Sequence, residues 1–468
     1  MKTSGSTIRR LFGASALGAG SAVALALFTA TGIAEEAEDY QLRQSIDHPV
    51  VNHANNPLLH KTYLRTRTVI PISADSLGIR RAVETAVAYD PEFRRTIEDA
   101  KVRRSEVWRA YAGFLPTVKA SIRHSHGTDI VSTSRSNNTE ANETVVSVEA
   151  SLPIVAGGSR IFRLKRTRAE RAAAEYDALA KGNDVIAGAA LAYLDLLTAR
   201  KRQEALKRNT QAVARIVQIT RSKHAKGFAD RSDISLAEAK FAQVKREYEL
   251  AVERRELAEH EFRSAVGDLP GGALSEPEDG GLPVHSADEA VAMALQRNPR
   301  LLAAHQSARA AKFAVREAVG ERMPRIDLTS KYENGIDGFD QGESWNVGVQ
   351  LTVPLIDPDA IPAISRSRHE AAAARYAAQD TARDVEKLVR DLWSTHHSAG
   401  RQLRQEGKRL SALRKAAQAA TKRYKHGYAA IDDVLSRQLE VLDAEIAVAE
   451  LRAQYKASAY RIAIEIGA

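Results

Sequence analysis

The feature that most constrains this chain is a helical stretch of about 65 residues without proline, running from Ser159 to about Ala225. A second stretch of similar length runs from about Pro362 to His426. At 1.5 Å per residue, each helix would be close to about 100 Å long. No globular core has that diameter, so we expect the helices to pack side by side as a rod or a tube. The low aromatic content of 6% and the abundance of Ala, Arg, Glu and Leu are typical of such helices.

Each long helix is expected to end at a glycine, Gly227 or Gly427, and a further helical stretch follows each of them. In both places an aromatic residue follows the glycine, and an aspartate (Asp233 or Asp433) lies six positions after it. Because glycine readily adopts the positive φ that reverses a helix, we predict two helical hairpins with similar tips. The repeat, about 200 residues apart, indicates an internal duplication. The two tip motifs are Lys226-Gly227-Phe228 and His426-Gly427-Tyr428.

Between the helices the hydrophobic period changes from helical to alternating, which is typical of strands. We expect Pro153 to end the second alternating run, and we expect polar loops at about 127–142 and 334–343. Each run, with its flanks, is about as long as a membrane-spanning strand needs to be, but a small soluble hairpin would show the same alternation. The four runs are 118–122, 146–152, 326–330 and 347–353.

The first 34 residues have the pattern of a cleaved secretory signal peptide. Arg9 and Arg10 precede an uncharged apolar stretch, and the small residues Gly32-Ile33-Ala34 suit a cleavage site. The alternative is an uncleaved anchor helix. No later stretch is apolar enough for a membrane helix, so any further span must be made of strands. The remaining predicted units are an extended arm (35–76), a first repeat (77–267), a linker (268–285) and a second repeat (286–468).

Four strands are too few to close a membrane barrel, whose minimum is about eight. An open sheet in a bilayer would expose unpaired backbone groups, which is prohibitive. If the strands enter a membrane, the barrel must therefore be shared between subunits. Two chains would give eight strands, and three would give twelve.

This duplicated order resembles that of the TolC family of outer-membrane efflux and secretion ducts, over about residues 77–466. The resemblance implies a mainly α fold with a membrane β-barrel, in which three chains share a twelve-stranded β-barrel and an α-barrel of long antiparallel helices. The matching motifs are Asp90-Pro91, Asn298-Pro299, Leu115-Pro116, Met323-Pro324, Ser151-Leu152-Pro153-Ile154, Leu351-Thr352-Val353-Pro354-Leu355-Ile356-Asp357 and the two tips.

The same resemblance implies a location and a set of partners. The protein is expected to be a homotrimer in the outer membrane of a Gram-negative bacterium, in contact with outer-membrane lipid and extending into the periplasm. It would serve as the exit duct of an efflux pump or a type I secretion system. Its partners would be a periplasmic adaptor (membrane fusion) protein and an inner-membrane pump or ABC transporter.

The resemblance also assigns roles at the tips. Both tip motifs match the segment by which the family contacts its adaptor. Asp433 matches an acidic residue that rings the pore entrance, Tyr424 matches a gate tyrosine, and Ser232 and Asp233 match the partners of that tyrosine on the neighbouring hairpin. The alternatives are structural: an aspartate near a helix start interacts favourably with the helix dipole, and Tyr424 would suit ordinary coiled-coil packing.

Two positions depart from the family pattern. Ala429 stands where the type member of the family has a gate arginine, and Ser436 stands where it has a second acidic ring. The gate is therefore expected to be held differently, through Arg231 or Arg423.

Other function classes find little support. The sequence contains no nucleophile–base pairing, phosphate-binding loop or nucleotide fingerprint, so we predict no enzyme activity, cofactor or metal site. Cysteine is absent, which excludes thiolate ligands and a lipid-modified N-terminal cysteine. The net charge of +9 would suit nucleic acid or an anionic membrane, and the export signal argues against nucleic acid. The alternative function is a periplasmic coiled-coil adaptor or structural rod without a pore, against which the four symmetrically placed strands argue.

Overall fold

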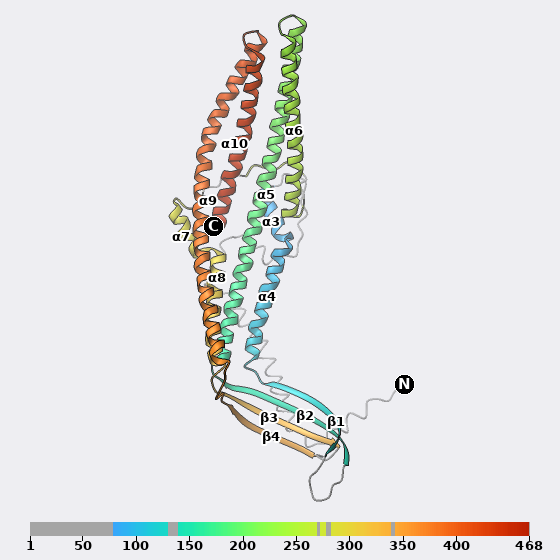
Figure 1. Cartoon of the computed structure of the whole chain (residues 1–468), viewed down its shortest axis with the longest axis vertical. Coiled ribbons are helices and arrows are strands. Elements are labelled where there is room, and N and C mark those ends of the chain that lie inside the picture. The colour runs from blue at the N-terminus through green and yellow to red at the C-terminus, as the bar shows by residue number, and fades with distance from the viewer. Residues whose placement is uncertain (1–77, 130–138, 269–271, 278–281, 338–341, 468) are drawn as a thin grey trace, which may run out of the picture. The chain divides into compact units, whose positions relative to one another are not determined.

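The computed structural model describes residues 78–467 except for 130–138, 269–271, 278–281 and 338–341. The predicted signal peptide and extended arm lie outside the described residues. Within the described part, both halves of the chain have the same order of two helices, two strands and two longer helices (Figure 1). The elements are α3 (Ile79–Tyr89), α4 (Pro91–Ala112), β1 (Thr117–Asp129), β2 (Thr139–Ala156), α5 (Ser159–Ala225), α6 (Arg231–Val266), α7 (Ala287–Arg297), α8 (Pro299–Gly320), β3 (Arg325–Asp337), β4 (Gly342–Thr352), α9 (Ala360–Lys425) and α10 (Ile431–Glu465).

The Asp-Pro and Asn-Pro pairs that match the family motifs begin α4 and α8. The carboxylate of Asp90 accepts a hydrogen bond from the backbone N–H of Phe93, at 2.6 Å. The side chain of Asn298 accepts from the backbone N–H groups of Arg300 and Leu301. The following proline suits the first helical position, where its missing N–H would have no partner in the helix. In the part of the chain that the structure describes, no helix has an apolar stretch long enough to cross a bilayer.

The helices lie side by side in the same order as the strands (Figure 1). Helix α5 packs against α4 and α8, and α8 packs against α5 and α9, so these four helices form a row. Among the described residues, four strands form one antiparallel sheet in the order β1-β2-β3-β4. The chain passes from α4 into β1, from β2 into α5, from α8 into β3 and from β4 into α9. The order of the helices in the row is therefore the order of the strands that continue them.

The register of the sheet places apolar side chains on one face. Ile122 lies opposite Val146, and Leu152 lies opposite Leu328, which lies opposite Val349. Because side chains alternate between the faces of a strand, these residues share one face. The other face is polar, with Lys119, Glu149 and Lys331 in successive register positions. The predicted alternation is confirmed in all four described strands, and it produces a sheet with one apolar and one polar face.

The expected loops between the strands were too long. The strands continue into the polar stretches, so residues 127–129, 139–142, 334–337 and 342–343 belong to strands. The physical reason is that backbone pairing extends a ladder whether or not the side chains are apolar. Side-chain pattern alone therefore underestimates strand length.

The expected end of a strand at Pro153 was also wrong. Strand β2 continues to Ala156, and its register against β3 shifts between Pro153 and Val155. Proline has no N–H for the ladder, and a bulge is one of the places where a strand accommodates it. Pro153 therefore produces an irregularity in β2 and does not end the strand.

Candidate functional site at the helical tips

The turn between α5 and α6 is a helix-ending motif centred on Gly227. The carbonyl of Lys223 accepts a hydrogen bond from the N–H of Phe228 at 2.9 Å, and the carbonyl of His224 accepts from the N–H of Gly227 at 2.9 Å. Gly227 has φ +71°. This pair of bonds around a left-handed residue is a Schellman motif, which satisfies the last carbonyls of a helix.

The turn between α9 and α10 repeats this geometry around Gly427, whose φ is +84°. The carbonyl of Arg423 accepts from the N–H of Tyr428 at 2.9 Å, and the carbonyl of Tyr424 accepts from the N–H of Gly427 at 3.1 Å. The predicted requirement for positive φ is confirmed at both tips. The aromatic side chain after each glycine points into solvent, Phe228 with 78% and Tyr428 with 75% of its surface exposed.

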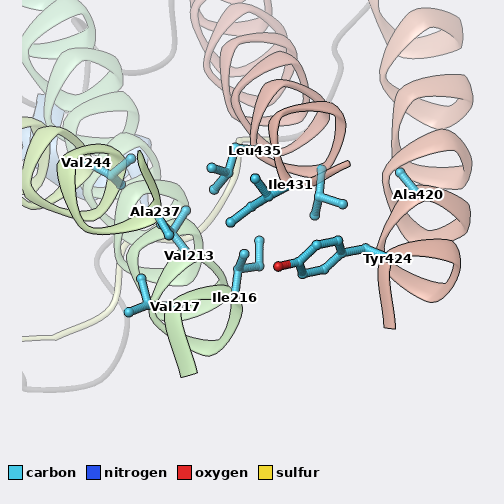
Figure 2. Close-up of a cluster of buried hydrophobic side chains, with 10 residues drawn as sticks. Val213, Ile216, Val217, Ala237, Val244, Ala420, Tyr424, Ile431 and Leu435 are labelled. Atoms are coloured by element: carbon cyan, nitrogen blue, oxygen red, sulfur yellow. The ribbon is translucent and has the colours of Figure 1, made fainter. Parts of the chain in front are cut away.

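Behind the tips, the two hairpins of the chain meet in a buried apolar cluster (Figure 2). All four helices α5, α6, α9 and α10 contribute to it, and Tyr424 reaches into it from α9, with its ring directed toward Ile216 of α5. The cluster holds the tips of the two hairpins together within one chain. Its buried members are Val213, Ile216, Val217, Ala237, Val244, Ala420, Tyr424, Ile431, Val434 and Leu435.

The hydroxyl of Tyr424 forms a hydrogen bond across this cluster. It lies 2.7 Å from Oγ1 of Thr220, which itself donates to the carbonyl of Ile216 at 2.9 Å. Since the single hydroxyl hydrogen of Thr220 is engaged there, Tyr424 is the donor in the bond between the two side chains. Burial raises the pKa of Tyr424, and the charge of Asp233 raises it further, while the bond to Thr220 opposes the shift.

Lys223 forms a second link between the hairpins. Its ammonium group donates a hydrogen bond to the backbone carbonyl of Tyr424 and lies 4.0 Å from the centroid of the Tyr424 ring. A cation over a tyrosine face is attracted by the negative face of the ring. Sequence reasoning singled out neither Thr220 nor Lys223. A usable signal was that they lie three residues apart on one face of α5, just before the tip.

Neither predicted partner of Tyr424 forms a hydrogen bond with its hydroxyl among the described residues of this chain. The carboxylate of Asp233 turns back and accepts a hydrogen bond from the backbone N–H of Asp230 at 3.3 Å, so it caps the start of α6. Ser232 is exposed and has no hydrogen bond or ion pair among the described residues. The hydroxyl of Tyr424 bonds instead to Thr220, and Asp233 affects it only through its charge.

Asp433 is placed differently from Asp233. Its carboxylate oxygen lies 3.4 Å from Nε of Arg437, one turn further along α10. The residue at the N-cap of α10, Ala430, offers no side-chain oxygen for capping. Asp433 is half-buried, whereas its neighbour Asp432 is exposed. The two aspartates six positions after the tip glycines therefore have different surroundings.

The two arginines expected to hold the gate are not bonded to Tyr424. Arg423 donates to the carbonyl of Tyr428, at 3.3 Å, within its own tip. Arg231 is exposed at the first position of α6, and its side chain forms no hydrogen bond or ion pair with another residue of the described ranges. No group of three or more His, Asp or Glu side chains in that part of the chain is arranged to hold a metal ion.

Comparison with known proteins gives consistent matches. Residues 82–268 and 290–468 match the outer membrane efflux protein family. The chain is 24% identical over 279 residues to the outer membrane efflux protein BepC of Brucella suis, a match covering 58% of this chain and 61% of that protein. It is 25% identical over 320 residues to the outer membrane protein TolC of Vibrio cholerae, covering 64% and 71%. Its fold superposes on the outer-membrane channel OprN with a TM-score of 0.76 at 19% identity, covering 83% of this chain and 89% of that one.

Proposed function

The chain belongs to the outer membrane efflux protein family, and we propose that it works as an exit duct of an efflux pump or a type I secretion system. In this role it carries substrates from the periplasm, or from an inner-membrane transporter, across the outer membrane to the exterior. The long helices extend into the periplasm and the sheet lies in the membrane. The predicted signal peptide directs the chain out of the cytoplasm.

The observation that carries this proposal is the matching order of the helix row and the sheet. The row ends at α4 on one side and α9 on the other, and the sheet ends at β1 and β4, which continue those same helices. A unit with two different edges closes when copies join edge to edge around an axis. Three copies provide twelve strands with the apolar face outward, toward lipid, and the polar face inward.

The tips are proposed to contact the periplasmic adaptor. An exposed aromatic residue beside a glycine offers a large apolar contact and a close approach to the backbone. Phe228 and Tyr428 supply the aromatic groups, and Gly227 and Gly427 supply the open backbone. The transporter in the inner membrane would be an energy-driven pump or an ABC transporter, joined to the duct by this adaptor.

The closed entrance is proposed to depend on Tyr424 and Asp433 in different ways. Tyr424, with Thr220 and Lys223, links the two hairpins of one subunit and so stabilises the closed arrangement. Asp433 would occur three times around the axis of a trimer, where its carboxylates attract cations. Asp233 and Ser232 remain proposed entrance residues, with Asp233 acting on Tyr424 through its charge.

The alternative function, a periplasmic rod or adaptor without a pore, is disfavoured by the apolar face of the sheet. Val349 and Leu351 on β4 expose 66% and 61% of their surface in the single chain. Large exposed apolar patches mark surfaces that bind protein or membrane. Such a face is costly on a periplasmic rod and expected on a barrel in lipid.

Two measurements on the full-length, detergent-solubilised protein test the proposal. Mass determination should give a trimer, and addition to planar bilayers should give discrete conductance steps. A stable monomer or dimer without conductance would support the rod.

Gly427→Trp should abolish export while trimers still reach the outer membrane, because the large side chain blocks the adaptor contact. Normal export by that variant would mean that the tip does not contact the adaptor.

A further inference from the structure

The first turns of α5 carry an unusual excess of positive charge. Five cations occur within residues 160–168, at the helix end where the dipole already repels them. A buried carboxylate, Glu317 of α8, lies 2.7 Å from both Arg163 and Arg166, and Glu321 and Glu170 complete the compensation of these two. The remaining cations need another explanation. The five are Arg160, Arg163, Lys165, Arg166 and Arg168.

One of the remaining cations belongs to a small aromatic and basic surface. Nζ of Lys165 and Cζ of Arg316, on α8, each lie 5.6 Å from the centroid of the Phe162 ring. Lys312 is exposed one turn before Arg316 on the same helix. Among the described residues none of these three cations has a carboxylate partner, and all three side chains are exposed. We call Phe162, Lys165, Lys312 and Arg316 the junction patch.

The position of Arg160 relative to β3 indicates on which side of the sheet the junction patch lies. Burial lowers the pKa of Arg160, the charge of Asp327 opposes that shift, and the charges of Arg163 and Arg325 add to it, so Arg160 is within electrostatic range of both residues of β3. Asp327 and Arg325 occupy register positions on the polar face of β3. Phe162 follows Arg160 by two residues, which is about 200° around a helix. The junction patch therefore lies on the opposite side, the side of the apolar face of the sheet.

The patch also lies close to the end of the sheet. Strand β2 ends at Ala156, and Phe162 is in the first turn of the helix that follows. Arg316 lies one turn before the end of α8, which leads into β3. Aromatic rings and long cationic side chains at this depth are typical of the interface between hydrocarbon and headgroups.

We propose that the junction patch binds the headgroups of anionic phospholipids in the periplasmic leaflet of the outer membrane. The inference rests on the proposed function, which places the apolar face of the sheet in that membrane. The positive charges of Lys165, Lys312 and Arg316 attract the phosphate groups, and the ring of Phe162 inserts at the level of the lipid glycerol. Because the chain has no cysteine to carry a lipid, these contacts supply an attachment at the inner surface of the membrane.

The test uses full-length protein reconstituted in phosphatidylcholine vesicles that contain a trace of spin-labelled phosphatidylglycerol or spin-labelled phosphatidylcholine. Electron spin resonance measures the fraction of each label that is immobilised by the protein. The wild type should select phosphatidylglycerol, and Lys165→Gln/Arg316→Gln should reduce that selectivity by about fivefold for each cation removed. Raising the salt concentration should reduce the wild-type selectivity as well.

A matched control is Lys207→Gln/Lys408→Gln, which removes the same charge from exposed positions far from the sheet. This control should retain the wild-type selectivity, and Lys165→Arg/Arg316→Lys should retain most of it. The inference is overturned if the wild type immobilises the two labelled lipids equally. It is also overturned if Lys165→Gln/Arg316→Gln leaves the ratio of the two immobilised fractions unchanged. In either case bilayer conductance would continue to support the exit duct. Failure of wild type to insert and conduct overturns both.

Discussion

Oη of Tyr424 lies 2.7 Å from Oγ1 of Thr220, although the two residues are 204 positions apart in the sequence. The bond continues through Thr220 to the carbonyl of Ile216, so a side chain of the second repeat is anchored on the backbone of the first. Lys223 reinforces this link by donating to the carbonyl of Tyr424. The two hairpins of one chain are thus joined by polar contacts inside an apolar cluster, where hydrogen bonds are least weakened by water.

Tyr424→Phe should loosen the proposed closed entrance. The change removes one hydrogen bond and leaves Thr220 still bonded to Ile216. The free energy that holds the two hairpins together should therefore fall by about 0.5–1.5 kcal/mol. Open events in planar bilayers should become more frequent. Tyr428→Phe is the matched control, because Tyr428 is exposed and its hydroxyl has no partner in the described structure. A double-mutant cycle of Tyr424→Phe with Thr220→Val should show an interaction energy between the two positions. Strictly additive effects would contradict the hydrogen bond between the two side chains.

The two tip glycines should be sensitive to alanine because of their backbone conformation alone. A Cβ at Gly227 or Gly427 would meet nothing within 4 Å, but both residues have positive φ. Gly427→Ala should therefore destabilise the tip by about 1–2 kcal/mol. Gly407→Ala in α9 meets equally open space without positive φ, and should stabilise its helix by about 1 kcal/mol. Hydrogen exchange of the amides next to each substituted glycine measures both changes in stability. If Gly427→Ala and Gly407→Ala change stability equally, positive φ is not the cause of the effect at the tip.

Replacement of Asp433 should change ion selectivity, and replacement of Asp432 should not. Asp433→Ala is expected to lower cation selectivity and block by trivalent cations in planar bilayers, because in the proposed trimer it would remove a ring of three carboxylates. Arg437 lies 3.4 Å from Asp433, so Arg437→Gln should have the opposite effect on selectivity. If Asp432→Ala behaves like Asp433→Ala, or if the wild-type pore prefers anions, Asp433 is only a residue of the helix start.

Acidic pH should weaken the packing of α9 against α10 around His396. Burial lowers the pKa of this histidine, and the nearby His397 lowers it further, while a hydrogen bond to the carbonyl of Tyr455 opposes the shift. A histidine whose pKa is lowered in the folded state contributes stability above its unfolded value of about 6.5, and loses it as pH falls through the folded value. The protection factors of amides in α9 and α10, in which the intrinsic slowing of exchange in acid is divided out, should therefore fall below about pH 6.5. His396→Gln should flatten that dependence.

The large elements could be predicted because their signals are long and repeated. The absence of proline from Ser159 to Ala225, and the helix-starting pairs Asp90-Pro91 and Asn298-Pro299, correspond to the observed helices. The alternating runs gave the correct faces of the strands, since each pattern is set by the period of the backbone. The strand ends were less predictable, because a bulge at Pro153 and a continuing ladder depend on the partner strand.

The contacts at the tips were harder to predict from the sequence than the tips themselves. Tyr424 could be singled out by its place before Gly427, but its partner Thr220 depends on how two hairpins pack across a gap of 204 residues. The expected partner, Asp233, is committed to the start of α6 by its bond to Asp230. A local capping interaction that forms within one turn competes with a bond across the bundle, and the sequence does not show which one prevails.

The one-to-one continuation of strands into helices has a consequence for the evolution and assembly of such ducts. Adding or losing a subunit would change the circumference of the membrane part and of the periplasmic part in the same step, so neither diameter can be altered independently by changing the number of copies. The exposed edges of β1 and β4 must also be protected until partners arrive, since unpaired strands aggregate. Insertion into the membrane and construction of the helical tube are then a single cooperative event, and a subunit that arrives alone is unfinished at both ends.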